Sequence, residues 1–386
     1  MKSIFEHGRF GRGLAWLLVA VLWCGGALTG YTRAQQRQQP PQGQTQKKTP
    51  AKPGQPEQDE VTLAQDEEIE RVNTDLTAVL FTAVDKNKRF VTTLKQEDVR
   101  VLEDGVPQPI FTFQRETERP LSLAILIDTS QSQERTLPDE KNAAREFVDA
   151  IIRPNKDEVA IVSFTGDSTL EQGMTGSLQR IRRAIDHVDF VRPSGYVGGG
   201  VIVGTPPISG TNQQLAASTA IWDAIMATST DVFQETSDKT RRAMILITDG
   251  VDTSSQYGRI PDAINAAIKA DAVIYSVGIG DAYLYGVEEA SLRKLSERTG
   301  GRAYFPKSEE DLRAAFAQIQ QELRSQYLIA YSPTNKARDG QFRQVRIEIN
   351  NPELRKENLR LTYRQGYFAK GGGGEAHTST QKNKRP

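Results

Sequence analysis

Short hydrophobic runs alternate with amphipathic segments along the middle of the chain. An uninterrupted apolar run is typical of a strand buried on both faces, and apolar residues three or four apart are typical of a helix packed on one side. Strands are expected at 121–128, 159–164, 243–248, 272–277 and 301–305, and helices at 138–152, 178–188, 218–226, 261–270, 288–298 and 308–323. This alternation predicts an α/β fold with a doubly wound parallel sheet.

Shorter strand-like segments flank this middle region on both sides. Before it, 72–115 contains several short apolar runs, and Asp104-Gly105 between two of them is a strong hairpin signal. After it, the segments 342–349 and 359–363 alternate apolar and polar residues. The first group has too few strands to be stable alone. We therefore expect the two chain ends to build a smaller β-sandwich, with the α/β domain inserted between them.

The N-terminus has the pattern of a secretory signal peptide. Basic residues precede an apolar stretch at 14–28, which is too short to span a membrane comfortably. Small residues at Thr32 and Ala34 predict cleavage after Ala34, and an uncleaved anchor is the alternative. We therefore expect a secreted or periplasmic protein that has no membrane contact after cleavage. Cleavage would remove Cys24, whose neighbour Trp23 is too bulky for the usual lipid-attachment pattern.

Polar, low-complexity segments complete the predicted organisation. Gln, Pro and Lys dominate the segment after the signal peptide, which cannot bury enough apolar surface to order itself. The predicted divisions are a signal peptide at 1–34, a disordered linker at 35–70, the two sandwich parts at 71–118 and 326–369, the α/β domain at 119–325, and a disordered tail at 370–386.

Composition narrows the possible chemistry. The chain has 49 basic and 49 acidic residues, so its zero formal net charge gives no argument for nucleic-acid binding. It has one cysteine and three histidines, which nearly excludes thiolate zinc sites, disulfides and most histidine-based catalysis. A loop rich in Gly and Pro at 193–212 lacks the phosphate-loop pattern and its lysine. Such a long loop is either functional or disordered.

Side-chain oxygens cluster where the first buried strand ends. Asp128 closes the apolar run, and Ser130 and Ser132 follow it. Ligands in open α/β sheets bind beyond the carboxyl ends of the strands. A carboxylate and two hydroxyls favour a hard cation such as Mg²⁺, Ca²⁺ or Mn²⁺. The alternative is that these residues only end the strand and cap the next helix.

Three separated motifs together resemble the von Willebrand factor type A domain. They are Asp128-Thr-Ser130-Gln-Ser132, Thr219 at the start of the helix STAIWDAI, and Asp249 after the run ILIT. The resemblance implies that Asp128, Ser130, Ser132, Thr219 and Asp249 surround one Mg²⁺, or Mn²⁺ or Ca²⁺, in a metal-ion-dependent adhesion site. The flanking segments are similar to secreted bacterial proteins of the acidobacterial type, so the likeness covers roughly 72–369. The chain departs from the family pattern at Gln131, where glycine is frequent, and in its longer insertion before Thr219.

The expected function is binding and not catalysis. Neutral hydroxyls and one or two carboxylates leave a divalent cation incompletely neutralised, so its open position should attract an Asp or Glu carboxylate of a protein partner. The sequence thus predicts a secreted metal-dependent adhesion or protein-binding module. One alternative is an envelope assembly or structural factor whose metal site is non-functional. A metal-dependent hydrolase is disfavoured, because aspartyl-phosphate enzymes need a second acid where this chain has Ser130.

Other residues near these motifs have simpler interpretations. Asp252 is interpreted as a solvated loop carboxylate, with an indirect role at the metal site as the alternative. Trp222 is expected in the core and His187 on a helix surface. Tyr283 and Tyr285 are either contacts at the rim of the site or ordinary exposed loop aromatics. The sequence does not determine the oligomeric state.

Overall fold

A computed structural model of the protein describes residues 76–116, 118–190, 196–197, 200–201, 218–280 and 286–371. The predicted signal peptide and linker, Cys24, Tyr283 and Tyr285, most of the loop at 193–212 and nearly all of the predicted tail lie outside the described residues. Two short paired strands of that loop, β8 (Tyr196–Val197) and β9 (Gly200–Val201), are described.

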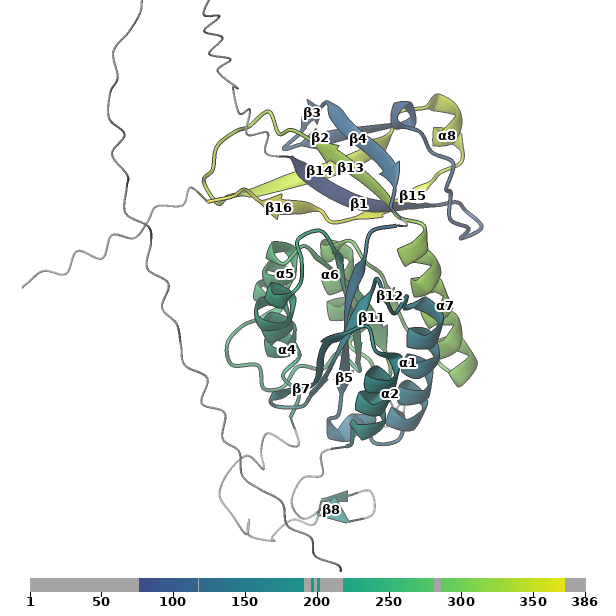
Figure 1. Ribbon diagram of the computed structural model, residues 1–386, viewed down its shortest axis with the longest axis vertical. Coiled ribbons are helices and arrows are strands. Elements are labelled where there is room, and N and C mark those ends of the chain that lie inside the picture. The colour runs from purple at the N-terminus through teal and green to yellow at the C-terminus, as the bar shows by residue number, and fades with distance from the viewer. Residues whose placement is uncertain are drawn as a thin grey trace, which may run out of the picture. The chain divides into compact units, whose positions relative to one another are not determined.

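A six-stranded sheet forms the centre of the α/β region (Figure 1). Its central strand, β5 (Leu121–Asp128), is buried at every position and runs parallel to both neighbours. The strands on one side of β5 are β10 (Arg241–Thr248), β11 (Ala272–Gly278) and β12 (Ala303–Tyr304), and those on the other side are β6 (Glu158–Phe164) and β7 (Ser168–Thr175). The prediction of an α/β fold around a mainly parallel sheet is confirmed.

The edge strand β7 departs from the predicted all-parallel arrangement. It pairs antiparallel with β6 because a tight turn joins the two strands directly, closed by the Thr165 N–H donating to the Asp167 carbonyl at 2.9 Å. The β7 sequence STLEQGMT is polar and only partly buried, so it lacks the apolar run that identifies the inner strands. The sheet is therefore mixed at this edge.

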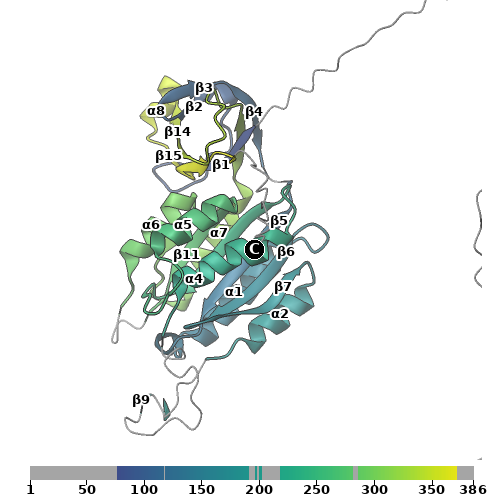
Figure 2. The same ribbon diagram turned by 90° about the vertical axis from the view of Figure 1, so that its left-hand side faces the viewer.

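Helices cover both faces of the sheet, as Figures 1 and 2 show. One face packs against α1 (Leu137–Ile151), α2 (Leu178–His187) and α7 (Glu309–Arg324). The other packs against α4 (Ile221–Ala227), α5 (Ile260–Lys269) and α6 (Glu289–Thr299). The last turns after α4 are η3 (Thr228–Val232) and η4 (Phe233–Glu235). Among the helices that the structure describes, none is long and apolar enough to cross a membrane.

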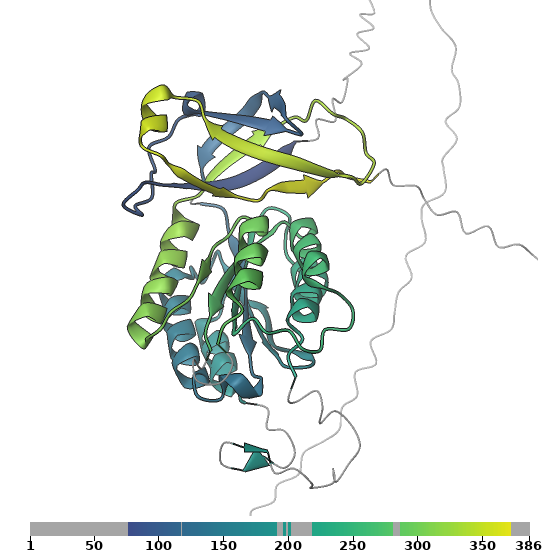
Figure 3. The same cartoon turned by 180° about the vertical axis from the view of Figure 1, so that it is seen from behind.

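Two antiparallel sheets combine strands from both ends of the described chain (Figure 3). The first has the order β15 (Arg360–Tyr363), β1 (Thr77–Val84), β13 (Tyr327–Tyr331), β4 (Ile110–Arg115). The second has the order β16 (Gly366–Phe368), β14 (Phe342–Ile349), β2 (Val99–Glu103), β3 (Val106–Gln108). They share a hydrophobic core, and η1 (Gln96–Asp98) and α8 (Pro352–Lys356) are short helices in their connections.

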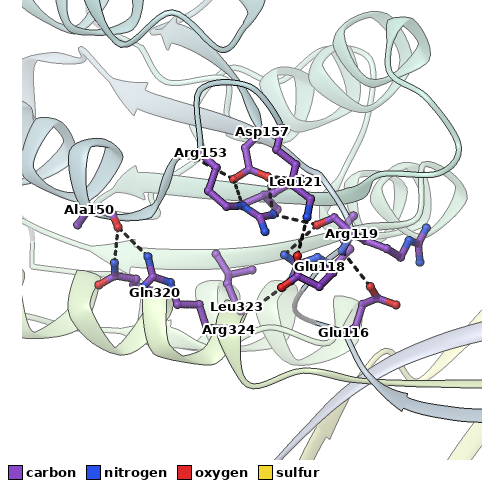
Figure 4. A network of polar contacts seen from close by, with 12 residues as sticks. Glu116, Glu118, Arg119, Leu121, Ala150, Arg153, Asp157, Gln320, Leu323 and Arg324 are labelled. Carbon is purple, nitrogen blue, oxygen red and sulfur yellow. Dashed lines mark hydrogen bonds and ion pairs between the residues drawn. The ribbon is translucent and has the colours of Figure 1, made fainter.

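A polar network fixes the amino end of β5 (Figure 4). The buried carboxylate of Asp157 accepts hydrogen bonds from the Leu121 backbone at 2.9 Å and from Arg153 Nε at 2.7 Å. Burial alone would raise the pKa of Asp157, but the Arg153 guanidinium and these donors hold it below its usual value. Gln320 and Arg324 of α7 both donate to the Ala150 carbonyl at 2.8 Å. Asp157 therefore anchors the strand whose other end carries Asp128, and the bonds to Ala150 join α7 to α1.

Candidate metal site

The order in which strands are added to the sheet reverses between β5 and β10, and the candidate residues lie at this switch point. From β5 the chain proceeds through α1 to β6 on one side, whereas β10, β11 and β12 follow one another on the other side. Such a switch leaves the carboxyl ends of two adjacent parallel strands uncovered by a crossing connection. Asp128 is the last residue of β5, and Asp249 comes directly after β10.

Asp128 is fully buried and holds the turn that follows β5. Its Oδ1 accepts a hydrogen bond from the Ser130 backbone N–H at 2.9 Å, and its Oδ2 accepts one from Thr248 Oγ1 at 2.6 Å. Ser130 Oγ lies 3.1 Å from Ser132 Oγ, close enough for either hydroxyl to donate to the other. The turn therefore brings both predicted hydroxyls together beside the end of β5. Thr248 links Asp128, at the start of this turn, to β10.

Thr219 lies two residues before α4 and not within it, because the helix begins at Ile221 and not at Ser218. The Ala220 N–H donates to the Thr165 carbonyl at 2.6 Å, just past the end of β6. The preceding residue of that strand, Phe164, accepts the Thr129 N–H at 2.9 Å. The Thr219 segment and the Asp128 turn are thus both fixed to the end of β6.

Asp249 belongs to the same cluster. Its Oδ1 accepts the Val251 N–H at 3.0 Å, and its charge is near enough to Asp128 to raise the pKa of that residue. Only Ser132 among the five predicted residues is more than marginally exposed; Asp128, Ser130, Thr219 and Asp249 are at most 5% exposed. Three separated segments therefore meet at one rim of the sheet.

Two buried acids at this rim resist ionisation. Burial is the main cause that raises the pKa of Asp128 to about 7, and the charge of Asp249 adds to it. Burial also raises the pKa of Glu140 in α1 to about 8, with contributions from the charges of Asp128 and Asp249. The Thr136 hydroxyl lies near enough to lower the pKa of Glu140 in part, but it donates to Gln133 at 3.0 Å and leaves the Glu140 oxygens without a well-formed hydrogen bond among the described residues. Asp128 and Glu140 are therefore buried close enough to Asp249 for its charge to disfavour their ionisation.

The donor chemistry fits a hard divalent cation. In the described part of the chain, no group of three or more His, Cys, Asp or Glu side chains is placed to hold a metal ion. The predicted set instead has two carboxylates and three hydroxyls, all oxygen donors, which Mg²⁺, Mn²⁺ and Ca²⁺ accept. A cation beside Asp128 would favour the ionised carboxylate against the burial, and the smaller effect of the Asp249 charge, that raise its pKa.

Sequence reasoning missed two residues of this region, Thr248 and Glu140, and its preferred interpretation of a third, Asp252, was incorrect. Thr248, the last residue of the run ILIT, supplies the hydroxyl that binds Asp128. Glu140 lies on the same helical stripe as Ala144 and Phe147, so its spacing placed it on the buried face of α1. Asp252 was expected to be a solvated loop carboxylate, which is wrong: its Oδ1 accepts the Ile221 N–H at 2.8 Å and caps α4. Of these residues, only Glu140 could have been found from the sequence, through its helical spacing in α1.

The remaining expectations concern residues outside the cluster. Trp222 is buried in the core between the sheet and α4, as predicted. His187 is exposed at the end of α2, and its Nδ1 lies 2.7 Å from the Arg183 carbonyl oxygen, so it takes no part in the site.

Solved structures with related folds include proteins from a mussel and from bacteria. Proximal thread matrix protein 1 from the mussel byssus, in a structure with a zinc-occupied MIDAS motif, is 20% identical over 57% of this chain and 50% of its own, with a TM-score of 0.42. The chain thus spans about half the length of that protein. BatB from Bacteroides thetaiotaomicron is 18% identical over 52% of this chain and 98% of its own, with a TM-score of 0.38. A von Willebrand factor type A protein from Catenulispora acidiphila is 14% identical over 78% of this chain and 74% of its own, with a TM-score of 0.42.

Sequence comparison gives the family more directly than these structures, whose TM-scores are all below 0.5. A comparison with curated proteins gives no match. Two sequence models, both described as the von Willebrand factor type A domain, match residues 207–321 and 123–251, which together include all the predicted ligand residues. The resemblance to this family is confirmed, and we conclude that the chain carries a von Willebrand factor type A domain.

Proposed function

We propose that the protein is a secreted binding module that holds a divalent cation at Asp128, Ser130, Ser132, Thr219 and Asp249 and uses it to bind a carboxylate of a protein partner. The observation that carries the proposal is the meeting of these oxygen-bearing segments at the switch point of the sheet, where Asp128 and Asp249 are both buried and the charge of Asp249 contributes to the raised pKa of Asp128. Mg²⁺ is the expected ion, with Mn²⁺ or Ca²⁺ as substitutes.

The composition of the site favours binding over catalysis. Hydroxyls are neutral ligands, so a cation held here keeps part of its positive charge and can attract an Asp or Glu side chain of another protein. The site offers no cysteine or histidine to act as a nucleophile or base. Cleavage after Ala34, secretion or a periplasmic location, and membership of the acidobacterial-type group are further parts of the proposal.

Cation binding is the first test. We would titrate purified protein with Mg²⁺, Mn²⁺ and Ca²⁺ by calorimetry after treatment with EDTA, and compare Asp249→Ala with Asp231→Ala. Asp231 is an exposed aspartate on the turn after α4 and serves as a matched control. The wild type and Asp231→Ala should bind one ion, and Asp249→Ala should not.

Partner binding is the second test. Protein loaded with Mg²⁺ should bind acidic peptides, and the same peptides with Asp and Glu replaced by Asn and Gln should not bind. Removal of the ion with EDTA should abolish the interaction. Wild-type protein that binds no divalent ion would refute the proposal and favour an assembly factor with a non-functional site, whereas turnover of phosphate esters would favour a hydrolase.

A further inference from the structure

We propose that Asp252 is a positioning residue for the metal site: it caps α4 from a distant loop and thereby fixes the hydroxyl of Thr219 relative to Asp249. The inference rests on the proposed metal-dependent function and identifies what sets the geometry of that site. Asp252 is not one of the five predicted ligands, and it lies in the loop that begins at Asp249.

The start of α4 has no cap of its own. Ala220 occupies the position before the helix, and its side chain cannot accept a hydrogen bond from the first turn. Asp252 supplies the missing acceptor: its Oδ1 lies 2.8 Å from the Ile221 nitrogen and 3.4 Å from the Trp222 nitrogen. Ser255 Oγ donates to the same oxygen at 2.6 Å and so holds the carboxylate in place.

The backbone of Thr219 is bonded to the same loop on both sides. Its N–H donates to Thr253 Oγ1 at 2.8 Å, and its carbonyl accepts the N–H groups of Thr253 at 2.8 Å and Ser254 at 3.1 Å. Thr219 is outside any helix or strand, so its position depends on these contacts and on the bond from the next residue, Ala220, to the Thr165 carbonyl. The loop that carries one candidate ligand, Asp249, therefore also determines where another ligand lies.

The helix holds the loop in return. The carboxylate of Asp223, in the first turn of α4, accepts the N–H of Gln256 at 2.6 Å and that of Tyr257 at 3.1 Å. Ser255 Oγ accepts the Trp222 N–H at 3.1 Å and the Asp223 N–H at 3.3 Å. Because each segment supplies acceptors for the other, the two are expected to move as one unit and to keep Thr219 and Asp249 at a fixed separation.

This arrangement predicts a specific effect on ion preference. Mg²⁺ requires nearly ideal octahedral geometry with oxygens at about 2.0–2.1 Å, whereas Ca²⁺ accepts more variable geometry at about 2.3–2.6 Å. A small displacement of Thr219 should thus weaken Mg²⁺ binding more than Ca²⁺ binding. A cap that served only the stability of α4 would leave the ratio of the two affinities unchanged.

The test compares Asp252→Ala with Asp252→Asn in the full chain, by titrating each with Mg²⁺ and with Ca²⁺ and by measuring the thermal midpoint in EDTA. Asn keeps an acceptor oxygen and should bind both ions nearly as the wild type does. Asp252→Ala should lose about 10- to 100-fold in Mg²⁺ affinity, as is usual when a residue that orients a metal ligand is removed, and clearly less in Ca²⁺ affinity.

A milder variant covers the case in which Asp252→Ala does not fold. Ser255→Ala removes the hydroxyl that holds Asp252 and should shift the ratio of Mg²⁺ to Ca²⁺ affinity in the same direction, by a smaller factor. Equal Mg²⁺ affinity in the wild type and Asp252→Ala, or equal losses for both ions, would overturn the inference while leaving the proposed function in place. Wild-type protein that binds neither ion would overturn both.

Discussion

Glu140 gives a sharp prediction because it is a fully buried acid that lies close to two other acids. The change is Glu140→Gln, which keeps the shape of the side chain and removes its charge. Burial and the charges of Asp128 and Asp249 raise the pKa of Glu140 from 4.5 to about 8 in the folded protein. Since one pKa unit corresponds to about 1.4 kcal/mol, this shift is linked to a change of about 5 kcal/mol in the free energy of unfolding.

The direction follows from which state binds the proton more tightly. The folded state binds the proton of Glu140 more tightly than the unfolded state does. The stability gained from this proton is complete below the unfolded pKa near 4.5 and is lost progressively as the pH rises to about 8. Above that pH the wild type buries an ionised carboxylate. Glu140→Gln has no proton to lose, so the variant should match the wild type near pH 4 and exceed its stability near pH 9 by up to about 5 kcal/mol.

Urea unfolding over a pH series, with EDTA present throughout, measures this difference from the midpoint and slope of each curve. Glu146→Gln is the matched control on the same helix, because Glu146 is exposed and its ion pair with Arg313 at 3.2 Å is at the surface. Its stability should differ from that of the wild type by less than about 1 kcal/mol, as is usual for an ion pair at the surface. If the difference between the wild type and Glu140→Gln is the same at pH 4 and pH 9, the reasoning about burial is refuted.

Three further predictions concern the metal site and the smaller core. The pKa of Asp128 is about 7, so Mg²⁺ affinity measured by calorimetry should fall about tenfold per pH unit below that value, and a flat profile between pH 5 and 7 would contradict this. Tyr331→Phe should cost about 1 kcal/mol in urea unfolding, because its hydroxyl donates to the buried Glu103 Oε2 at 2.9 Å and Tyr367 also donates to that oxygen at 2.9 Å; an unchanged midpoint would show that the Tyr367 donor is sufficient. Gly250→Ala should lower the thermal midpoint, since Gly250 has a φ of +84° and an added Cβ would lie 2.9 Å from Leu292 Cγ; an equal or higher midpoint would count against it.

Hydrophobic pattern alone was enough to predict the centre of the fold. The run at 121–128 is buried at every position, as expected of a strand in the middle of a sheet. Because such runs end abruptly at polar residues, the sequence also indicated that Asp128 and Asp249 lie at the same edge. The two ends do lie side by side, with Ile127 opposite Ile247 in the register of β5 and β10.

The features that the sequence did not indicate depend on contacts between distant segments. The start of α4 is set by Asp252, which follows Ile221 by 31 residues, so no local signal in STAIWDAI indicated that the helix begins after Thr219. The edge strand β7 lacks an apolar run because none of its residues is fully buried. Glu140, in contrast, had a local signal, because its helical spacing placed it on the buried face. That signal is easily discounted, since a charged residue is expected to face solvent unless it is paired.

The buried acids connect the stability of the protein to its proposed function. In the absence of a cation, the fold must either keep Asp128 and Glu140 protonated or bury their charges, and the raised pKa values express that cost. A divalent ion beside Asp128 offsets the same cost, so ion binding and folding should stabilise each other. Exposed carboxylates could also bind a cation, but the ion would then offset no cost of burying their charge. We therefore expect the ion to increase the thermal stability of the wild type most at high pH, where Glu140 is ionised, and to do so less in Glu140→Gln.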